Sequence, residues 1–524
     1  MIQDNAIWVA QGENPIHLLL NQANRHGLIA GASGTGKTVT LKTIAQGFSQ
    51  AGVPVFVADV KGDVTGMAQA GDDTDKLRER LQKLGAADAW VPQACPVHIW
   101  DMLGDAGIPV RITVSDMGSE LLSRMLNLTD VQSGVLDIVF HVADEQQLLL
   151  IDLKDLRSML AYVDEHSKEL ETTYGRVSSQ SIGAILRALL SIEDEGANLF
   201  FGEPSLDLQD WFANNKDGQG YINILNASKL IQSPQIYAMF LLWMLSELFE
   251  TLPEAGDLDK PKFVFFFDEA HLLFNNMPAD LRNKIIQVVK LIRSKGVGLY
   301  FITQSPSDIP DEVLAQLSNR VQHGLRAYTP AEQKNIKAAA AAFRENPNLD
   351  AQAALQELGT GEALISFLNE EGQPSIVERA MVIAPQCQMG KADDAAIEAA
   401  LSAQGELMEK YGQAIDRESA FEMLSAQEAQ AKEADALNQE REALQKEREA
   451  LEKAQAKEAE KAQREAEKEA KRQAKAAEKE AERQAKAAAK EQERAAKAVQ
   501  SMVGKFGREA GKQLLRGLFG NLRR

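Results

Sequence analysis

Eight residues near the N-terminus combine glycines, a lysine and a threonine at the spacing of a phosphate-binding loop. They fit the pattern G-x-x-x-x-G-K-[ST] and are Gly31, Ala32, Ser33, Gly34, Thr35, Gly36, Lys37 and Thr38. Glycines let the backbone approach phosphate closely and turn its N–H groups inward. In this pattern the lysine reaches the β- and γ-phosphates and the threonine ligates Mg²⁺. The competing interpretation is a chance glycine-rich turn.

The residues on either side of this loop argue against a chance match. The short apolar run 27–30 before it can form a buried strand. After it, apolar residues recur at helical spacing, at Val39, Leu41, Ile44, Ala45 and Phe48. A strand–loop–helix order places the loop at a helix N-terminus, whose partial positive charge attracts phosphate.

Two adjacent carboxylates follow a run of five large apolar residues at 263–267. Such a run suits a central strand that is covered on both faces. Asp268 at its end would then hold Mg²⁺ through water, as in a Walker B motif, and Glu269 would polarise the attacking water. The alternative is a buried strand that meets the acidic N-terminus of a helix.

Two further predicted strands end in polar residues. The run 53–59 ends in Asp59, which we count among the nucleotide-binding residues. The run 297–303 ends at Gln304, which is well placed to sense a γ-phosphate if this strand lies beside the one that carries Asp268. The alternative for Gln304 is a turn before Ser305 and Pro306.

The pattern predicts an α/β domain over residues 1–390, with a mostly parallel central sheet and a helical insertion at about 116–215. We expect further strands at 97–100 and 110–114. Residues 391–425 form a connecting helical region, and we expect truncation after about residue 392 to leave the ATPase fold intact. Residues 426–499 form a long charged helix, and 500–524 a basic amphipathic tail that could bind a membrane or a protein partner.

The long helix is only marginally suited to a coiled coil. Leu437, Leu444 and Leu451 repeat at seven residues, but the second apolar position of the heptad is weak. Glu-to-Lys spacings of four stabilise a solvated helix without a partner. We therefore expect a helix that projects into solvent.

Composition limits the class and compartment of the protein. The 524 residues include two cysteines, Cys95 and Cys387, which suggest neither a disulfide framework nor a zinc site. The first residues lack the features of a signal peptide, so we expect a cytoplasmic protein. The formal net charge is −19, and basic and acidic residues balance after residue 390. The acidic excess therefore lies in the ATPase part, which is not the footprint of a general nucleic-acid binder.

Four segments together resemble the HerA/FtsK family of P-loop ATPases, and most closely the bacterial HerA-like proteins of the YjgR type. They are residues 31–38, 59–63, 265–271 and 296–306. The resemblance implies a RecA-like core that binds ATP and Mg²⁺, a homo-hexameric ring with nucleotide between subunits, and DNA as a possible partner. It also implies a γ-phosphate sensor at Gln304, a family basic residue at Arg293, and candidates for an arginine finger at Arg25 and Arg320.

Two functions remain open from the sequence. The first is an ATP-hydrolysing ring ATPase that acts as a DNA helicase or translocase. The alternative is a nucleotide-gated assembly or membrane-associated scaffold that acts through the C-terminal extension. A basic ring lumen would favour the first, and an acidic lumen the second.

Overall fold

A computed structural model of the chain describes residues 2–3, 5–102, 106–229, 233–256, 258–274 and 279–502. It divides into two compact units, Met1–Gln427 and Glu428–Arg524. Within the described residues, no helix is both long enough and apolar enough to cross a membrane.

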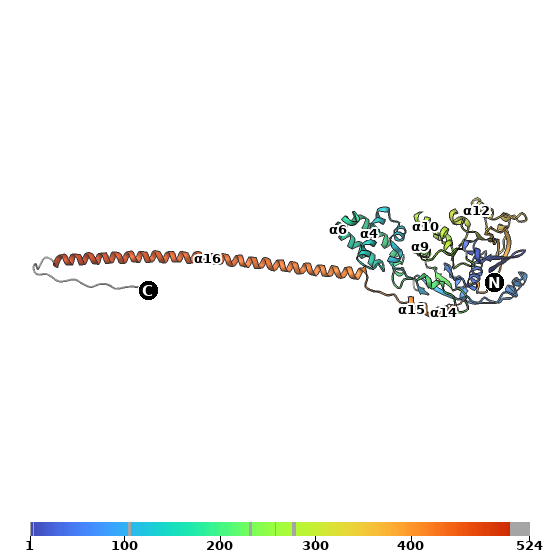
Figure 1. The fold of residues 1–524 in the computed structure, drawn as a ribbon, viewed down its shortest axis with the longest axis horizontal. Coiled ribbons are helices and arrows are strands. Elements are labelled where there is room, and N and C mark those ends of the chain that lie inside the picture. Colours follow the sequence, from blue (N-terminus) through green and yellow to red (C-terminus); the bar gives the residue numbers. More distant parts are fainter. Residues whose placement is uncertain are drawn as a thin grey trace. The chain divides into compact units, whose positions relative to one another are not determined.

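A single sheet forms the centre of the first unit (Figure 1). Its parallel part runs in the spatial order β11 (Asn319–His323), β4 (Gly27–Ala30), β10 (Val297–Thr303), β9 (Phe263–Phe267), β5 (Val55–Asp59), β8 (Ile222–Asn226), β6 (Val97–Asp101) and β7 (Ile108–Pro109). Antiparallel strands extend it beyond β11, in the order β12 (Glu362–Ser366), β13 (Glu378–Val382), β2 (Ala6–Gln11) and β1 (Ile2–Gln3), with β3 (Pro15–Leu19) also paired to β2.

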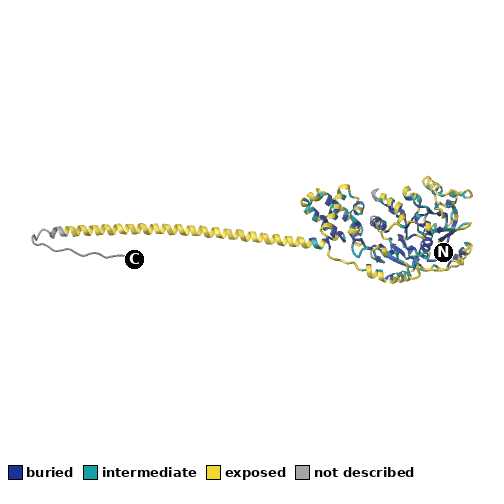
Figure 2. Ribbon diagram, viewed as in Figure 1, coloured by how far each residue is buried: buried dark blue, intermediate teal, exposed yellow. Residues whose placement is uncertain are grey.

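Apolar side chains cover both faces of the parallel strands. Most of the buried residues lie in the first unit (Figure 2). On one face Ile29, Val57 and Phe266 pack against α1 (Lys37–Gln50), the helix that follows the glycine-rich loop. On the other face Phe265 and Phe267 pack against α9 (Pro234–Thr251) and α10 (Ala279–Leu291). Central strands buried on both sides explain the continuous apolar runs in the sequence. The expected α/β fold with a mostly parallel sheet is confirmed.

The helices between β7 and β8 form the insertion. They are α3 (Val114–Met125), α4 (Asp130–Glu145), α5 (Leu153–Glu165), α6 (Ser167–Tyr174), α7 (Ser179–Asp194), α8 (Ala197–Phe200) and η3 (Leu208–Phe212). The strand expected at 110–114 was wrong, because β7 covers only Ile108–Pro109 and α3 begins at Val114. Thr113 caps α3 in a capping box with Asp116, a local signal that outweighs the β-branched residues before it.

The remaining helices lie in the connections between strands. They are η1 (Leu20–Arg25), η2 (Val64–Ala68), α2 (Asp75–Lys83), η5 (Ala270–Leu273), η6 (Ile292–Lys295), η7 (Pro306–Asp308), α11 (Asp311–Leu314), α12 (Pro330–Ala341) and α13 (Ala351–Glu357). The chain then continues through α14 (Asp394–Ala403) and α15 (Gly405–Tyr411) into α16 (Ala420–Met502).

Residues 388–424, which we call the strap, tie the end of the first unit to its earlier parts. Lys42 of α1 is fully buried, and its ammonium donates hydrogen bonds to the carbonyls of Gln388, Met389 and Gly390. Further along, the side chain of Gln404 exchanges hydrogen bonds with the backbone of Ile99 in β6. The strap is therefore packed against the sheet rather than free of it.

The strap then crosses the insertion. Tyr411 is fully buried, its ring lies 5.8 Å from that of Trp100, and its hydroxyl donates to Asp210. Arg417 donates two hydrogen bonds to the carboxylate of Glu203, at 2.7 and 2.6 Å.

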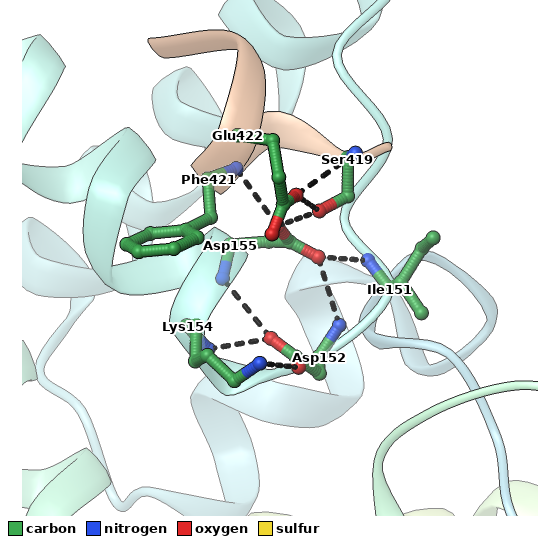
Figure 3. A network of polar contacts seen from close by, with 7 residues as sticks. All are labelled: Ile151, Asp152, Lys154, Asp155, Ser419, Phe421 and Glu422. Carbon is green, nitrogen blue, oxygen red and sulfur yellow. Dashed lines mark hydrogen bonds and ion pairs between the residues drawn. The ribbon is translucent and has the colours of Figure 1, made fainter. Parts of the chain in front are cut away.

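One carboxylate joins the insertion to the beginning of α16 (Figure 3). Asp155 is 1% exposed, and its Oδ2 accepts hydrogen bonds from the backbone of Ile151 and Asp152 at the start of α5. Its Oδ1 accepts from the Ser419 hydroxyl at 2.6 Å and from the Phe421 backbone at 2.9 Å. Asp155 therefore satisfies free N–H groups at the N-termini of two helices.

Helix α16 begins at Ala420, six residues before the expected start. The expected start was the beginning of the charged stretch, and the first residues of the helix are mostly apolar. Ala420 and Leu424 are buried against the insertion, whereas the described side chains from 425 to 497 are exposed (Figure 2). Glu-to-Lys or Glu-to-Arg pairs four residues apart recur along it, as in Glu428–Lys432. The basic tail expected at 500–524 lies outside the described residues, except that α16 reaches Met502.

The packing of the strap corrects the expected truncation point. We expect a chain ending at Gln427 to keep the unfolding midpoint of the full chain. A chain ending at residue 392 should lose about 3 kcal/mol or more, because it removes the buried Tyr411 and Leu424 and leaves cavities. Thermal unfolding followed by tryptophan fluorescence measures this, since Trp100 contacts Tyr411. Equal midpoints for the two truncations would contradict the result.

Candidate active site

Four parallel strands, β4, β10, β9 and β5, bring the predicted site residues to one edge of the sheet. Thr303 of β10 pairs with Ala30 of β4, and Phe301 of β10 pairs with Phe267 of β9. Ala58 of β5 also pairs with Phe267. The residues at or just after these strand ends therefore lie along the same edge, namely Gly31, Gln304, Asp268 and Asp59. Gln304 is exposed there, and β10 separates the strand of the phosphate-binding loop from that of Asp268.

The glycine-rich loop is held by backbone contacts to three neighbouring segments. The N–H of Gly31 donates to Thr303, that of Ala32 to Gly324, and the carbonyl of Thr35 accepts from Gly361. Gly31 has φ +153°, and a Cβ there would lie 2.6 Å from the Cβ of His323. Only glycine therefore fits at this position, where the loop passes closest to β11.

Lys37 folds back over this loop. It is 7% exposed, and its Nζ donates to the carbonyls of Gly31 at 2.7 Å and Ala32 at 3.2 Å. Burial, reinforced by the charge of Lys61, lowers the pKa of Lys37. An anion in the loop would offer this ammonium stronger acceptors than two carbonyl oxygens. Thr38, the next residue of α1, is partly buried.

Asp268 has one buried oxygen that accepts no hydrogen bond from the described residues. Its Oδ1 accepts from the N–H of Glu269 at 2.9 Å, and its Oδ2 is without a partner there. Burial raises the pKa of Asp268 to about 6, although the charge of Lys61 opposes the rise. A buried oxygen of this kind suits a divalent cation, bound directly or through water. The described residues contain no group of three or more His, Cys, Asp or Glu that could hold a metal, and Mg²⁺ needs only one or two protein ligands beside waters and phosphate.

Glu269 forms an ion pair that the sequence reasoning missed. Its Oε1 lies 2.5 Å from the ammonium of Lys61, in the loop after β5. Burial would raise the pKa of Glu269, but the hydrogen bond and charge of Lys61 outweigh burial and lower it. The backbone of Glu269 is left-handed, with φ 47° and ψ 49°, which costs about 1–2 kcal/mol for a residue with a side chain. The pair forms because strands β5 and β9 are neighbours in the sheet, which local sequence spacing does not reveal.

Asp59 organises the loop that carries Lys61. Its carboxylate accepts hydrogen bonds from the N–H groups of Gly62, Val64 and Thr65, at 2.7, 3.0 and 3.2 Å. Burial and the charge of Asp63 raise its pKa to about 6. Among the described residues, the hydrogen bonds to this carboxylate come from the loop, so Asp59 holds the loop in place. Its place among the nucleotide-binding residues stays a prediction.

His323 supports the other side of the glycine-rich loop and was also missed. Its Nδ1 lies 2.8 Å from the carbonyl of Glu362, so this nitrogen donates and Nε2 accepts from the hydroxyl of Thr40 at 2.8 Å. Burial lowers the pKa of His323 to about 4, which keeps the ring neutral. A histidine at the end of the strand next to β4 was the only sequence signal for this contact.

The three predicted arginines lie toward the opposite edge of the sheet. Arg25 and Arg293 precede β4 and β10, and Arg320 is the second residue of β11. The guanidinium of Arg320 donates to the carbonyls of residues 314, 317 and 342. A finger reaching another subunit would have to give up these three bonds, so the geometry argues against that role for Arg320.

Comparisons with known proteins agree with this architecture. The family model described as Helicase HerA-like C-terminal matches residues 4–524. The chain is 22% identical over 370 residues to the DNA double-strand break repair helicase HerA of Sulfolobus acidocaldarius. The aligned region covers 67% of this chain and 64% of that protein. It is 30% identical over 151 residues to a probable helicase of Methanocaldococcus jannaschii, and this alignment covers 28% of each protein.

Among solved structures, the bacterial conjugative coupling protein TrwB in an unbound form has a TM-score of 0.50 at 14% identity. The match covers 75% of this chain and 92% of that one. TrwB bound to a non-hydrolysable ATP analogue gives the same TM-score. At this identity the likeness concerns the fold alone. The family match extends over nearly the whole sequence. The chain therefore belongs to the HerA-like helicase family.

Proposed function

We propose that the chain is a Mg²⁺-dependent ATPase of the HerA class that assembles into a ring and acts as a DNA translocase or helicase. The observation that carries the proposal is the convergence of Lys37, Asp268 and Glu269 at one sheet edge, beside the exposed Gln304. Phosphoryl transfer needs this combination of a cation, a metal ligand and a group that orients water.

Each residue has a distinct role in this proposal. Lys37 exchanges its two loop carbonyls for phosphate oxygens and neutralises their charge. Thr38 and Asp268 would hold Mg²⁺, which when bound offsets charge on the phosphates. Glu269, ionised and buried, orients the attacking water. Gln304 detects the γ-phosphate from the end of β10.

The family resemblance supports a homo-hexamer with nucleotide between subunits. In such a ring a residue from the neighbouring subunit completes the site. Arg25 remains a candidate for this finger, and because Arg320 is bound internally we add the family basic residue Arg293 as a second candidate. Both lie at the sheet edge opposite the glycine-rich loop, so neither serves the nucleotide of its own subunit.

DNA is the substrate that the similar HerA helicase suggests, although this chain spans 64% of that protein. The alternative is a nucleotide-gated scaffold that contacts a protein or membrane through the C-terminal extension. The acidic excess before residue 391 and the attachment of α16 to the insertion favour this alternative.

Lys37 and Glu269 should fail at different steps. We expect Lys37→Ala to weaken ATP binding by about tenfold or more, because a charge-assisted contact to phosphate is lost. Glu269→Gln should bind ATP normally and hydrolyse it about 100-fold more slowly. Calorimetric titration and phosphate release measure the two steps, with the exposed Lys216→Ala as control. Equal ATP affinity in Lys37→Ala and the parent chain would contradict the assignment.

A shared site should show complementation between subunits. We expect Arg25→Ala or Arg293→Ala, whichever is the finger, to reduce turnover by about 1,000-fold without unfolding the subunit. Mixing that variant with Lys37→Ala should restore part of the activity at hybrid interfaces. Arg320→Ala should instead lower the thermal unfolding midpoint, since it removes three internal hydrogen bonds. A fully active monomer at nanomolar concentration would refute the shared site.

DNA dependence separates the two candidate functions. For a translocase we expect single- or double-stranded DNA to stimulate ATP hydrolysis several-fold, and rising salt to reduce the effect as counterion release weakens binding. Phosphate release with each DNA at several salt concentrations is the measurement. A rate that neither DNA changes would favour the scaffold.

A further inference from the structure

The ion pair between Lys61 and Glu269 is asymmetric in exposure. The Lys61 side chain is 45% exposed, whereas that of Glu269 is 8% exposed, and the two charges lie 2.5 Å apart. A pair between two exposed residues contributes little to stability or geometry. Here the carboxylate has left water, so the ammonium is its principal charge partner and fixes where it points.

The backbone that carries Lys61 is itself fixed. Three N–H groups of the loop, those of Gly62, Val64 and Thr65, donate to the buried carboxylate of Asp59. Gly62 adopts φ +79°, which allows the sharp turn after Lys61. Thr65 closes the loop with a second bond from its hydroxyl to the carbonyl of Gly62. The backbone of Lys61 is therefore held by the loop, while its ammonium forms the ion pair with Glu269.

The second carboxylate oxygen of Glu269, Oε2, can accept a hydrogen bond from another partner. Oε2 is buried and accepts no hydrogen bond from the described residues, although Nδ1 of His271 lies 3.3 Å away. A buried carboxylate oxygen without a donor is expected to receive one from water or ligand. With Oε1 occupied by Lys61, Oε2 is the oxygen that can orient a water molecule toward a phosphate held over Lys37.

We propose that Lys61 is a positioning residue that clamps Oε1 of Glu269 so that Oε2 faces the attacking water. This inference rests on the proposed ATPase function and adds a residue to its machinery. Lys61 acts through Glu269 and has no contact with the phosphate in this scheme. The rigid loop matters because a displacement of a catalytic group by about 1 Å can reduce a rate by about 100-fold.

The test compares Lys61→Met and Lys61→Arg in the full chain, each with and without Glu269→Gln. We expect Lys61→Met to lower kcat by about 10- to 100-fold with KM and ATP affinity unchanged within about twofold. Lys61→Arg should recover most of the rate, because a guanidinium can also hold Oε1. In the Glu269→Gln background, Lys61→Met should have almost no further effect, since the group it positions is already disabled.

Lys216→Met, at an exposed lysine in the turn before β8, is the matched control and should retain the parent rate. Parent-like kcat in Lys61→Met would overturn the proposal. So would an equal loss in the Glu269→Gln background, or a fall in ATP affinity, because either would mean that Lys61 acts on the phosphate. If the parent chain hydrolyses no ATP, the proposed function itself fails. If the parent hydrolyses ATP and Glu269→Gln does not, the proposed function stands. Lys61 variants that depart from the results expected above then refute this inference alone.

Discussion

The hydrogen-bonded ladder of the parallel strands is the constraint on which the site depends. Strands β4, β10, β9 and β5 run in one direction, and their registers align Ala30, Thr303, Phe267 and Ala58 near their carboxyl ends. Whatever follows each strand must therefore emerge at the same edge. Segments far apart in sequence supply the glycine-rich loop, the sensing glutamine and the acidic pair, and backbone pairing alone brings them together.

Charge balance then determines how these side chains coexist. Besides Asp59, whose carboxylate holds the loop after β5, the edge contains the cations Lys37 and Lys61 and the carboxylates Asp268 and Glu269. Burial lowers the pKa of Lys37 and raises the pKa of Asp268, which favours the neutral form of each. Lys61 and Glu269 instead stabilise each other as ions. Lys37 and Asp268 are the residues assigned to phosphate and metal in the proposed function, and ligands of opposite charge would stabilise their ionised forms.

Local patterns predicted most of the fold and the core of the site. The loop around Lys37 and the acidic pair after β9 could be identified because each lies within a few residues of a strand end. The Lys61–Glu269 pair could not, since it depends on which strands are neighbours, and spatial order is not written in local spacing. The strand expected at 110–114 failed because a capping box at Thr113 began a helix. Arg320 was a candidate arginine finger from the sequence, yet in the fold its guanidinium donates hydrogen bonds to three backbone carbonyls.

The strap has a consequence for the order in which the chain acquires its structure. Lys42 binds carbonyls up to 348 residues later in the sequence, and Asp155 binds Ser419 across 264 residues. Contacts over such separations close large loops, and they form only after the surfaces that receive them exist. During synthesis the strap leaves the ribosome after the whole sheet and insertion. Until the strap arrives, the surfaces of Trp100 and β6 that it covers remain open to water, and a nascent chain with exposed apolar surface is prone to aggregate.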